Sequence, residues 1–281
     1  MKNKIIFYRP TLERATSAEE CKVLEAMATG LSDVYSEKIE WADYQLGAPA
    51  PIAVMFGWGK LRHKEVLKRQ ALVHGKTLVI NFGSLKRSEG YYTVGWNGLN
   101  GRAEYLNYSS PRDRWERLGI KLKPWKTGGR NIVVTGQVPS DGSVAQIDIL
   151  QWCEEQILNL RCLTDRPIIF RPHPLARDIS RDILGATRSE KSFDEDLEDA
   201  WAVVTYNSTS SSMAVIEGVP IFTADRGSMA WEVSRHELKA IDHPLRCDRT
   251  QWAYNLAYTQ WTVDEIRNGF AWGHLKGYCN D

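Results

Sequence analysis

Five hydroxyl side chains lie within the six residues 207–212, directly after a short apolar run at 202–206. The run is rich in β-branched and aromatic residues, which predicts a strand buried on both faces. Residues 213–217 continue as a helix turn that Gly218 ends. Such a turn presents hydroxyl and backbone N–H groups at the positive end of a helix dipole, where a phosphate binds favourably. Glu217 could then accept both hydroxyls of a ribose, although an ordinary capped helix after a polar loop is the alternative.

Polar groups also follow two other predicted strands, at 131–135 and 167–170. The first strand leads to Gln137, and the second leads to an Arg-Pro-His-Pro motif at Arg171–Pro174. Ligands bind beyond the carboxyl ends of the strands in an open parallel sheet, so we expect these loops and the hydroxyl turn on one edge. Arg171 offers a planar fork for phosphate oxygens and His173 a further donor. A lone histidine after a strand is nevertheless often structural.

The elements that position these groups alternate along the chain. In the first half, strands predicted at 4–8, 51–56 and 77–81 alternate with helices predicted at 17–31 and 60–74. The second half restarts the same alternation. This rhythm predicts an α/β fold in which helices cover the faces of parallel sheets.

The chain of 281 residues is long enough for two domains. Residues 121–130 contain a proline and a Gly-Gly pair, which is typical of an interdomain linker. We therefore predict domains at 1–128 and 129–262, followed by a C-terminal helix at 263–281 that packs back on the first domain. Residues 90–107 are dense in Gly, Asn and aromatic residues, and they predict irregular structure or a hairpin.

The net charge of +1 conceals an uneven distribution of charge. Residues 60–130 carry 16 Lys and Arg residues against 5 Asp and Glu residues. Basic side chains interleaved with aromatic ones suit a polyanion with stackable bases, or a sugar platform beside phosphates. A solvated basic face over core aromatics is the alternative. The aromatic residues concerned are Phe82, Tyr91, Tyr92, Trp96, Tyr105, Tyr108, Trp115 and Trp125.

Composition argues for a cytoplasmic protein. The sequence is 43% hydrophobic and 25% charged and has no apolar run long enough to span a membrane. The N-terminal residues 1–8 do not form a secretory signal. Five scattered cysteines without CxxC spacing predict reduced thiols and no zinc site.

The Arg-Pro-His-Pro motif at 171–174, followed by the Ser-rich stretch and Glu-Gly-Val-Pro at 208–220, resembles nucleotide-sugar glycosyltransferases of the two-domain GT-B type. The resemblance is strongest to the branch that contains capsule-polysaccharide (Kdo), sialyl and glycerophosphate transferases. Phage-encoded glycosyltransferases are similar too, including those that act on hydroxymethylated bases of phage DNA. The motifs cover about residues 131–225, and the first half agrees only in its α/β rhythm and in the neighbourhood of Trp96–Asn100 and Arg114–Trp115.

This resemblance implies two Rossmann-like parallel-sheet domains that face a cleft, the first binding the acceptor and the second the nucleotide-sugar donor. Arg171 and His173 would contact the donor phosphates, Glu217 the ribose, and Gln137 the donor or its sugar. The hydroxyl groups that would cap the same phosphate are those of Ser208, Thr209, Ser210 and Ser211. No metal is expected, because dipoles and basic side chains stabilise the leaving nucleotide. The one D-x-D pattern, at 194–196, falls in an acidic run that predicts a solvated surface.

Transfer to a hydroxyl group requires a general base. Asp141 is the first candidate because its loop leaves a strand beside the predicted donor site, although a turn residue is equally consistent with its Ser-Asp-Gly context. His63 and Glu104 are alternatives. The predicted acceptor-binding residues are Lys60, Arg62, Trp96, Asn97 and Asn100.

The sequence therefore predicts a metal-independent glycosyltransferase that uses a UDP-, GDP- or CMP-sugar and no bound cofactor. The preferred acceptor is the hydroxymethylated base of phage DNA, and a bacterial surface polysaccharide or lipopolysaccharide is the alternative. A sugar-nucleotide epimerase, a glycerophosphotransferase and a nucleic-acid-binding module of the same fold are further alternatives.

Overall fold

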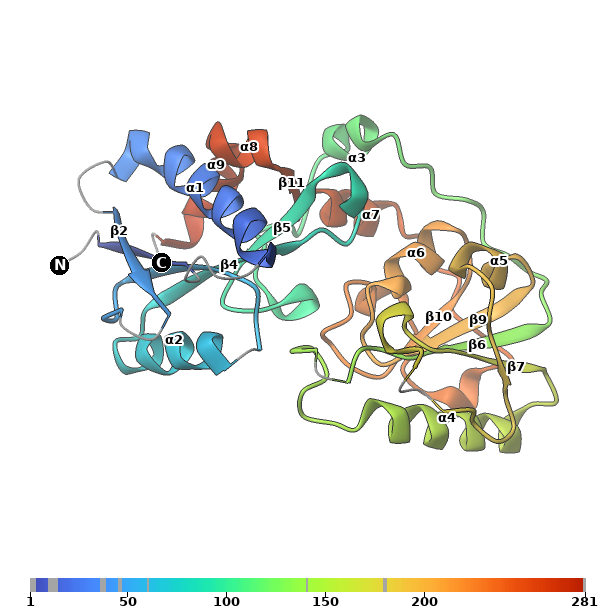
Figure 1. Ribbon diagram of the computed structural model, residues 1–281. Coiled ribbons are helices and arrows are strands. Elements are labelled where there is room, and N and C mark those ends of the chain that lie inside the picture. The colour runs from blue at the N-terminus through green and yellow to red at the C-terminus, as the bar shows by residue number, and fades with distance from the viewer. Residues whose placement is uncertain are drawn as a thin grey trace. The chain divides into compact units, whose positions relative to one another are not determined.

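The computed structural model describes residues 4–9, 15–35, 39–44, 47–59, 61–139, 141–178 and 181–279 (Figure 1). The chain forms two compact units. The first unit combines Met1–Arg114 with Tyr254–Asp281, and the second unit is Trp115–Ala253. The predicted domain boundary at 128/129 stays a prediction. Residues 121–130 hydrogen-bond within the second unit, where Lys123 N–H donates to the Ile216 carbonyl and Lys126 N–H to that of Gly218.

The first unit is built on a mixed sheet of strand order β11-β5-β4-β3-β1-β2. Strands β1 to β4 are parallel, whereas β5 and β11 run antiparallel to them. Every side chain of β3 is buried, because helices cover both faces of the sheet. The strands are β1 (Ile5–Arg9), β2 (Ile39–Asp43), β3 (Ile52–Phe56), β4 (Lys76–Phe82), β5 (Tyr91–Trp96) and β11 (Gln260–Thr262).

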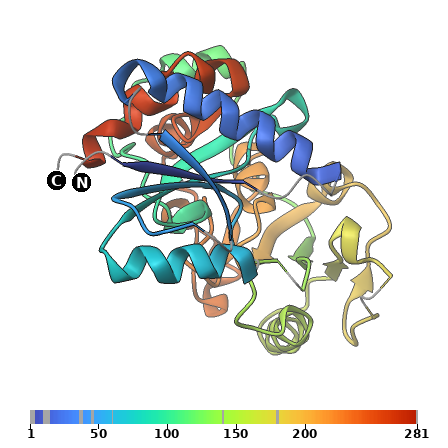
Figure 2. The same cartoon turned by 60° about the vertical axis from the view of Figure 1, so that its left-hand side comes forward.

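Helices cover the two faces of this sheet. Helix α1 (Ala15–Tyr35) lies on one face with the C-terminal helices α8 (Val263–Arg267) and α9 (Phe270–Leu275), and α2 (Leu61–Leu72) lies on the other (Figures 1 and 2). Gly30 allows the close approach of α1 and α8, because a Cβ atom there would meet the Ile266 carbonyl oxygen at 2.2 Å.

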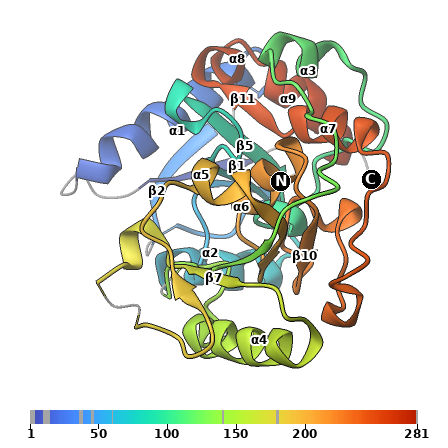
Figure 3. The ribbon, with the colours of Figure 1, turned by 90° about the vertical axis from the view of Figure 1, so that its right-hand side faces the viewer.

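The second unit is built on a parallel sheet of order β10-β9-β6-β7-β8. Helix α4 (Ile149–Leu163), capped by the Asp148 side chain, packs its apolar side on one face, and α5 (Phe193–Glu198) and α6 (Ser210–Ile216) lie on the other (Figure 3). The strands are β6 (Asn131–Thr135), β7 (Ile168–Arg171), β8 (Thr187–Arg188), β9 (Ala200–Thr205) and β10 (Ile221–Thr223). Helices α3 (Asp113–Leu118) and α7 (Thr250–Ala257) complete the set of α-helices in the described residues.

Each sheet has one topological switch point, where the chain leaves one side of a central strand and continues on the other. It lies between β1 and β3 in the first sheet and between β6 and β9 in the second. The loops at the carboxyl ends of two such strands diverge, and the crevice between them is where open α/β sheets bind ligands.

The α/β class and the parallel sheets predicted from the sequence are confirmed. Three elements were not predicted: β8, α5 and β11. Within 90–107, the hairpin alternative holds, since β5 pairs antiparallel with β4. Helix α1 begins at Ala15, two residues before the helix predicted at 17–31. The acidic run forms α5, with a capping box between Ser192 and Glu195; Asp194 and Glu195 are exposed as expected, whereas Asp196 is buried.

Candidate functional site

A side-chain network joins the loops at the switch point of the second sheet. Asn207, two residues after β9, forms two hydrogen bonds across the switch point: its Oδ1 accepts from Gln137 Nε2 at 2.9 Å, and its N–H donates to Gln137 Oε1 at 3.1 Å. Its Nδ2 donates to the Ser143 carbonyl and to Asp225 Oδ1, both at 2.9 Å. The loops after β6, β9 and β10 are thereby held together at the carboxyl edge.

The hydrogen-bonding capacity of Gln137 is taken up inside this network. Its amide also donates to Ser143 Oγ at 3.2 Å, and the residue is only 7% exposed. Both Nε2 and Oε1 of Gln137 therefore have hydrogen-bond partners within the chain. Gln137 thus fixes the loops of the predicted donor site; its predicted contact with a donor stays a prediction.

The hydroxyl turn supplies the groups beside this network. Ser211 Oγ is paired with the Ser208 carbonyl and with Ser228 Oγ, and Ser208 Oγ accepts from the Ser210 N–H at 3.3 Å. Ser210 Oγ and Ser212 Oγ are different, because both are buried and neither has a hydrogen-bond partner among the described residues. Thr209, at the N-cap of α6, is exposed, and its side chain makes no capping hydrogen bond. Buried polar groups normally have partners, so the hydroxyl of Ser210 requires an explanation.

Arg171 lies on the same edge as the hydroxyl turn, at the end of β7, but its guanidinium is engaged elsewhere. Its Nη1 donates to Asp196 Oδ2 at 2.7 Å and to the Lys191 carbonyl at 2.6 Å. The side chains of Arg171 and Asp196 are 11% and 4% exposed, respectively. Ser189 Oγ completes the pairing of Asp196. The prediction that residues 194–196 are solvated is therefore wrong at Asp196. Contact between Arg171 and a phosphate stays a prediction.

His173 follows Arg171 at the carboxyl edge. Its Nδ1 accepts a hydrogen bond from the Leu175 N–H at 3.1 Å. The neutral ring therefore carries its hydrogen on Nε2, which makes that nitrogen a donor.

Glu217 occupies the other end of α6 from the hydroxyl turn. It is the C-cap residue, and the rise of a helix puts roughly 10 Å between it and Ser210 along the axis. Its carboxylate pairs with Lys123, and this hydrogen bond raises the pKa of the lysine. The structure does not bring Glu217 together with the switch-point network, so its contact with a ribose stays a prediction.

The three predicted base candidates are all occupied by local contacts. Asp141 Oδ1 accepts from the Ser143 N–H at 2.8 Å, which is the turn interaction that its sequence context allows. Glu104 accepts from the Leu106 N–H and from the Tyr108 hydroxyl. His63 is 1% exposed and lies against Gly57, and its Nε2 accepts from Arg62 Nε at 3.3 Å.

Most of the predicted acceptor-binding residues have structural roles. Trp96 is fully buried and donates to the Leu275 carbonyl, which leaves no surface for an acceptor to contact. Asn97, with φ of 55°, bonds the Thr77 N–H and the Tyr278 hydroxyl, and Asn100, with φ of 51°, begins a short 3-10 helix. Arg62 lies at the carboxyl edge of the first sheet, and Lys60 lies outside the described residues.

The aromatic residues expected to interleave with basic ones are mainly core residues. Tyr92, Trp96, Tyr105 and Trp115 are buried, whereas only Tyr108 of the eight is exposed. The basic stretch therefore presents a charged surface with little aromatic area for stacking bases.

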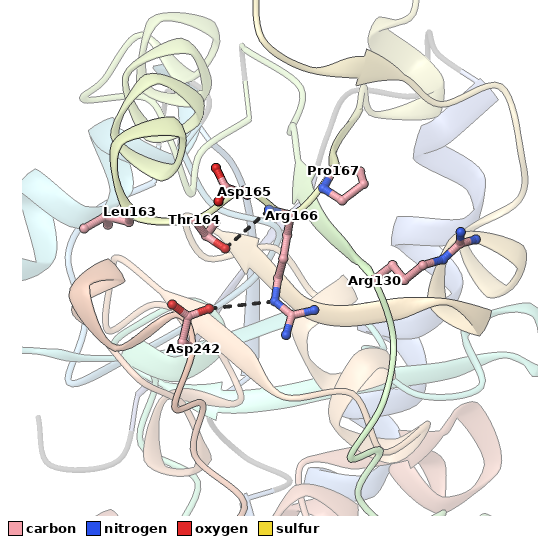
Figure 4. Close-up of a pocket in the computed structure, with 7 residues that line it drawn as sticks. All are labelled: Arg130, Leu163, Thr164, Asp165, Arg166, Pro167 and Asp242. Carbon is pink, nitrogen blue, oxygen red and sulfur yellow. Dashed lines mark hydrogen bonds and ion pairs between the residues drawn. The ribbon is translucent and has the colours of Figure 1, made fainter.

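A pocket of about 520 Å³ lies at the opposite, amino edge of the second sheet (Figure 4). It surrounds the residues that precede β6 and β7, and its arginines are paired with acids, Arg166 with Asp242 at 3.8 Å and Arg130 with Asp199 at 2.7 Å. It does not coincide with the switch point. Its lining residues are Arg130, Leu163, Thr164, Asp165, Arg166, Pro167 and Asp242.

The described residues show neither a metal-binding cluster nor a membrane-spanning helix. No group of three or more His, Cys, Asp or Glu residues in the described ranges is placed to hold a metal ion. Among the helices of the described residues, none is both long and apolar enough to cross a membrane.

Two residues of the second unit's edge were missed by sequence reasoning. Asn207 was read only as the start of the hydroxyl turn, and Asp225, whose Oδ1 also accepts from the Gly227 N–H, was not singled out. The signal for Asp225 is its place three residues after the short apolar run at 220–222, which is typical of a strand.

Both units thus have the Rossmann-like form, and the chain as a whole has the GT-B fold. The structure of the Thermosulfurimonas dismutans KpsC β-Kdo 2,7 transferase is similar over 97% of this chain and 99% of that chain, with 16% identity and a TM-score of 0.57. The β-Kdo 2,4 transferase of KpsC from the same organism is similar over 91% of this chain and 90% of that one, with 11% identity and a TM-score of 0.57. At these identities the likeness concerns the fold.

Sequence comparison adds no family. No protein-family model matches the chain, and no curated protein matches its sequence.

Proposed function

We propose that the protein is a glycosyltransferase that moves a sugar from a nucleotide-sugar donor to a hydroxyl acceptor. The observation that carries the proposal is the network of Gln137, Asn207 and Asp225 at the switch point of a GT-B fold. It fixes three loops where parallel sheets bind ligands, so a binding site there is preorganised before any ligand arrives.

The donor phosphates would lie against the hydroxyl turn. Ser210 Oγ, buried without a partner in the described part of the chain, and the exposed Thr209 side chain are the groups offered to them. The Nε2–H of His173 would be a further donor from the neighbouring loop. Developing charge on the leaving nucleotide would be stabilised by these oriented dipoles, without a metal ion.

We propose a bacterial surface polysaccharide as the acceptor. The two similar structures are named as Kdo transferases, and the burial of the aromatic residues weakens the case for stacking on DNA bases. DNA is the second candidate, because the positive charge of residues 60–130 would suit a polyanion. We place the reaction in the cytoplasm, since all five cysteines are free thiols.

The test is a panel of UDP-, GDP- and CMP-sugars, including a nucleotide-activated Kdo, offered with oligosaccharide acceptors and with hydroxymethylated duplex DNA. Mass spectrometry of the acceptors, in the presence of EDTA, would detect the added sugar. The proposal expects nucleotide release only when an acceptor is present, and transfer that EDTA does not abolish. If the sugar is added to the DNA and not to the oligosaccharides, DNA is the acceptor. If the donor is isomerised without transfer, the protein is an epimerase.

A further inference from the structure

The loop after β10 is bound to the hydroxyl turn of the same unit at two points. Asp225 Oδ1 accepts a hydrogen bond of 2.9 Å from Asn207 Nδ2, at the start of the turn. Ser228 Oγ lies 2.9 Å from Ser211 Oγ, inside the turn, and both serines are buried. These two contacts hold the segment between Asp225 and Ser228 beside the hydroxyl turn.

Arg226 occupies that segment. The Ser228 N–H donates to the Asp225 carbonyl at 3.1 Å, which closes a tight turn with Arg226 as its first corner residue. The Cα atom of Arg226 therefore lies about 3.8 Å from that of Asp225, a member of the switch-point network. The backbone that carries this arginine is fixed within the second unit alone.

The guanidinium of Arg226 is weakly held. Its side chain is exposed, and in the described ranges no acidic residue pairs with it. It lies 5.9 Å from the ring centroid of Trp231, near the limit of about 6 Å for a cation–π contact. A guanidinium held in this way can turn towards an anion that binds beside the loop.

Arg226 differs in this respect from the arginine that the sequence predicts at this edge. The guanidinium of Arg171 is buried against Asp196, which already balances its charge. The groups offered to a phosphate at the hydroxyl turn are hydroxyl groups and the neutral ring of His173, and none of them carries a positive charge. An arginine supplies that charge together with a planar fork of N–H donors that matches two phosphate oxygens.

We propose that Arg226 is the cationic residue that binds the phosphate of the donor beside the hydroxyl turn. This inference rests on the proposed function and deepens it, because it assigns the charge to a residue outside the predicted site. The guanidinium would leave the ring of Trp231 and donate two N–H groups to the phosphate. Negative charge grows on that phosphate as the nucleotide leaves, so a fixed positive charge there also favours the transfer.

Calorimetry on the full chain, with UDP, GDP and CMP as probes, tests the assignment. For each nucleotide that the wild type binds, Arg226→Gln should weaken the affinity by about 10-fold or more, because charge-assisted hydrogen bonds are lost. Arg226→Lys keeps the charge without the planar fork, so its affinity should fall between the two. The difference between wild type and Arg226→Gln should shrink as the NaCl concentration rises, because salt screens an exposed charge.

Arg235→Gln is the matched control. It removes the same charge from another exposed arginine of the second unit, whose N–H donates to the Ile221 carbonyl at 3.0 Å, so that its backbone lies beside β10 itself. We expect its nucleotide affinity to equal that of the wild type. This comparison separates a direct contact with phosphate from the general effect of net charge.

The outcomes separate the two proposals. If Arg226→Gln loses no more affinity than Arg235→Gln, or if its loss does not depend on salt, the assignment of Arg226 is overturned and the proposed function stands. If the wild type binds none of the three nucleotides and none of their sugar conjugates, the proposed function is overturned together with the assignment.

Discussion

The carboxyl edges of the two sheets use opposite chemistry. In the second unit the switch point is built mainly of amides and hydroxyl groups, with Asn207 and Gln137 bonded to each other. In the first unit it is built of ionisable groups, with Glu20 paired to Arg62 and Glu19 held by Tyr92. Neutral donors in fixed positions suit the binding of an anion, because their hydrogen bonds do not depend on pH. Ionisable groups suit proton transfer. The two carboxyl edges therefore differ in chemistry, with neutral groups predominating at the second and ionisable groups at the first.

The comparison is sharpest at Arg171, the charged residue predicted to bind phosphate at the second edge. Asp196→Asn would leave its guanidinium buried without its carboxylate, and breaking a buried ion pair in this way costs about 3–5 kcal/mol. Urea unfolding of the variant should therefore show the largest loss of stability among the changes considered. Glu154→Gln, which breaks the exposed pair with Arg181, should cost much less stability, because water screens the charges of that pair. Equal stabilities of the two variants would show that Arg171 is not structural and would restore its predicted role.

The second edge should also lose stability when its neutral network is cut. Asn207→Ala leaves the Gln137 amide and the Ser143 carbonyl without this partner in a buried place, and an unsatisfied buried group costs about 1–3 kcal/mol. Gln151→Ala removes an exposed amide that bonds only Glu155 on the same helix, and is the matched control. We expect nucleotide-sugar affinity to fall in the first variant alone. An Asn207→Ala protein with unchanged donor affinity would separate the network from the binding site.

The sequence predicts the strands that form both edges better than the contacts that the side chains at those edges make. Apolar β-branched runs predict β3, β6 and β9 to within two residues at each end, because a strand buried on both faces has few alternatives. The order of the strands follows from the alternation only in part. Strand β11 joins the first sheet from the far end of the chain, and three residues of it, Gln260–Thr262, carry no local signal of that pairing.

Side-chain partners depend on distant contacts, which explains the remaining differences. Asp196 reads as part of a solvated acidic run, yet it is buried and forms an ion pair with Arg171, 25 residues away. Trp96 reads as part of a binding loop, yet its partner is the Leu275 carbonyl, 179 residues away. Glu19 reads as a residue of a capping box, and only the pairing of β4 with β5 brings Tyr92 to it. The contact between Glu19 and Tyr92 is therefore a product of the tertiary fold.

Two adjacent serines allow a finer test of the second edge. Ser211→Ala removes a hydroxyl group bonded to Ser228 Oγ and the Ser208 carbonyl and should cost about 0.5–1.5 kcal/mol of stability. Ser210→Ala removes a hydroxyl group without a partner in the described residues and should leave stability unchanged, because no hydrogen bond is lost. Donor affinity, measured by calorimetry, should weaken in Ser210→Ala. If Ser210→Ala instead lowered stability with no effect on affinity, its hydroxyl would be structural and the phosphate would have to bind elsewhere.

The difference in ionisable groups also predicts where pH acts within the first unit. His274 on α9 is half-buried between Tyr258 and Trp261, with Nε2 2.8 Å from the Tyr105 carbonyl oxygen, and burial, helped by nearby Arg114, lowers its pKa below the ordinary 6.5. The unfolded chain therefore takes up a proton at this residue more readily than the folded chain. Its contribution to the free energy of unfolding is present above pH 6.5 and is lost as the pH falls from there through the lowered pKa.

Hydrogen exchange between pH 7 and pH 5, corrected for intrinsic rates, should show amides of β5 and β11 losing protection as the pH falls, since both strands lie under α9 and its neighbours. His274→Asn should flatten this decline in the first unit and leave the exchange of β6 and β9 unchanged. The effect is expected to be the smallest of those considered, because a single half-buried ring is involved. An equal loss of protection in β6 and β9 would mean that both units respond to protonation. It would contradict a pH effect confined to the first unit.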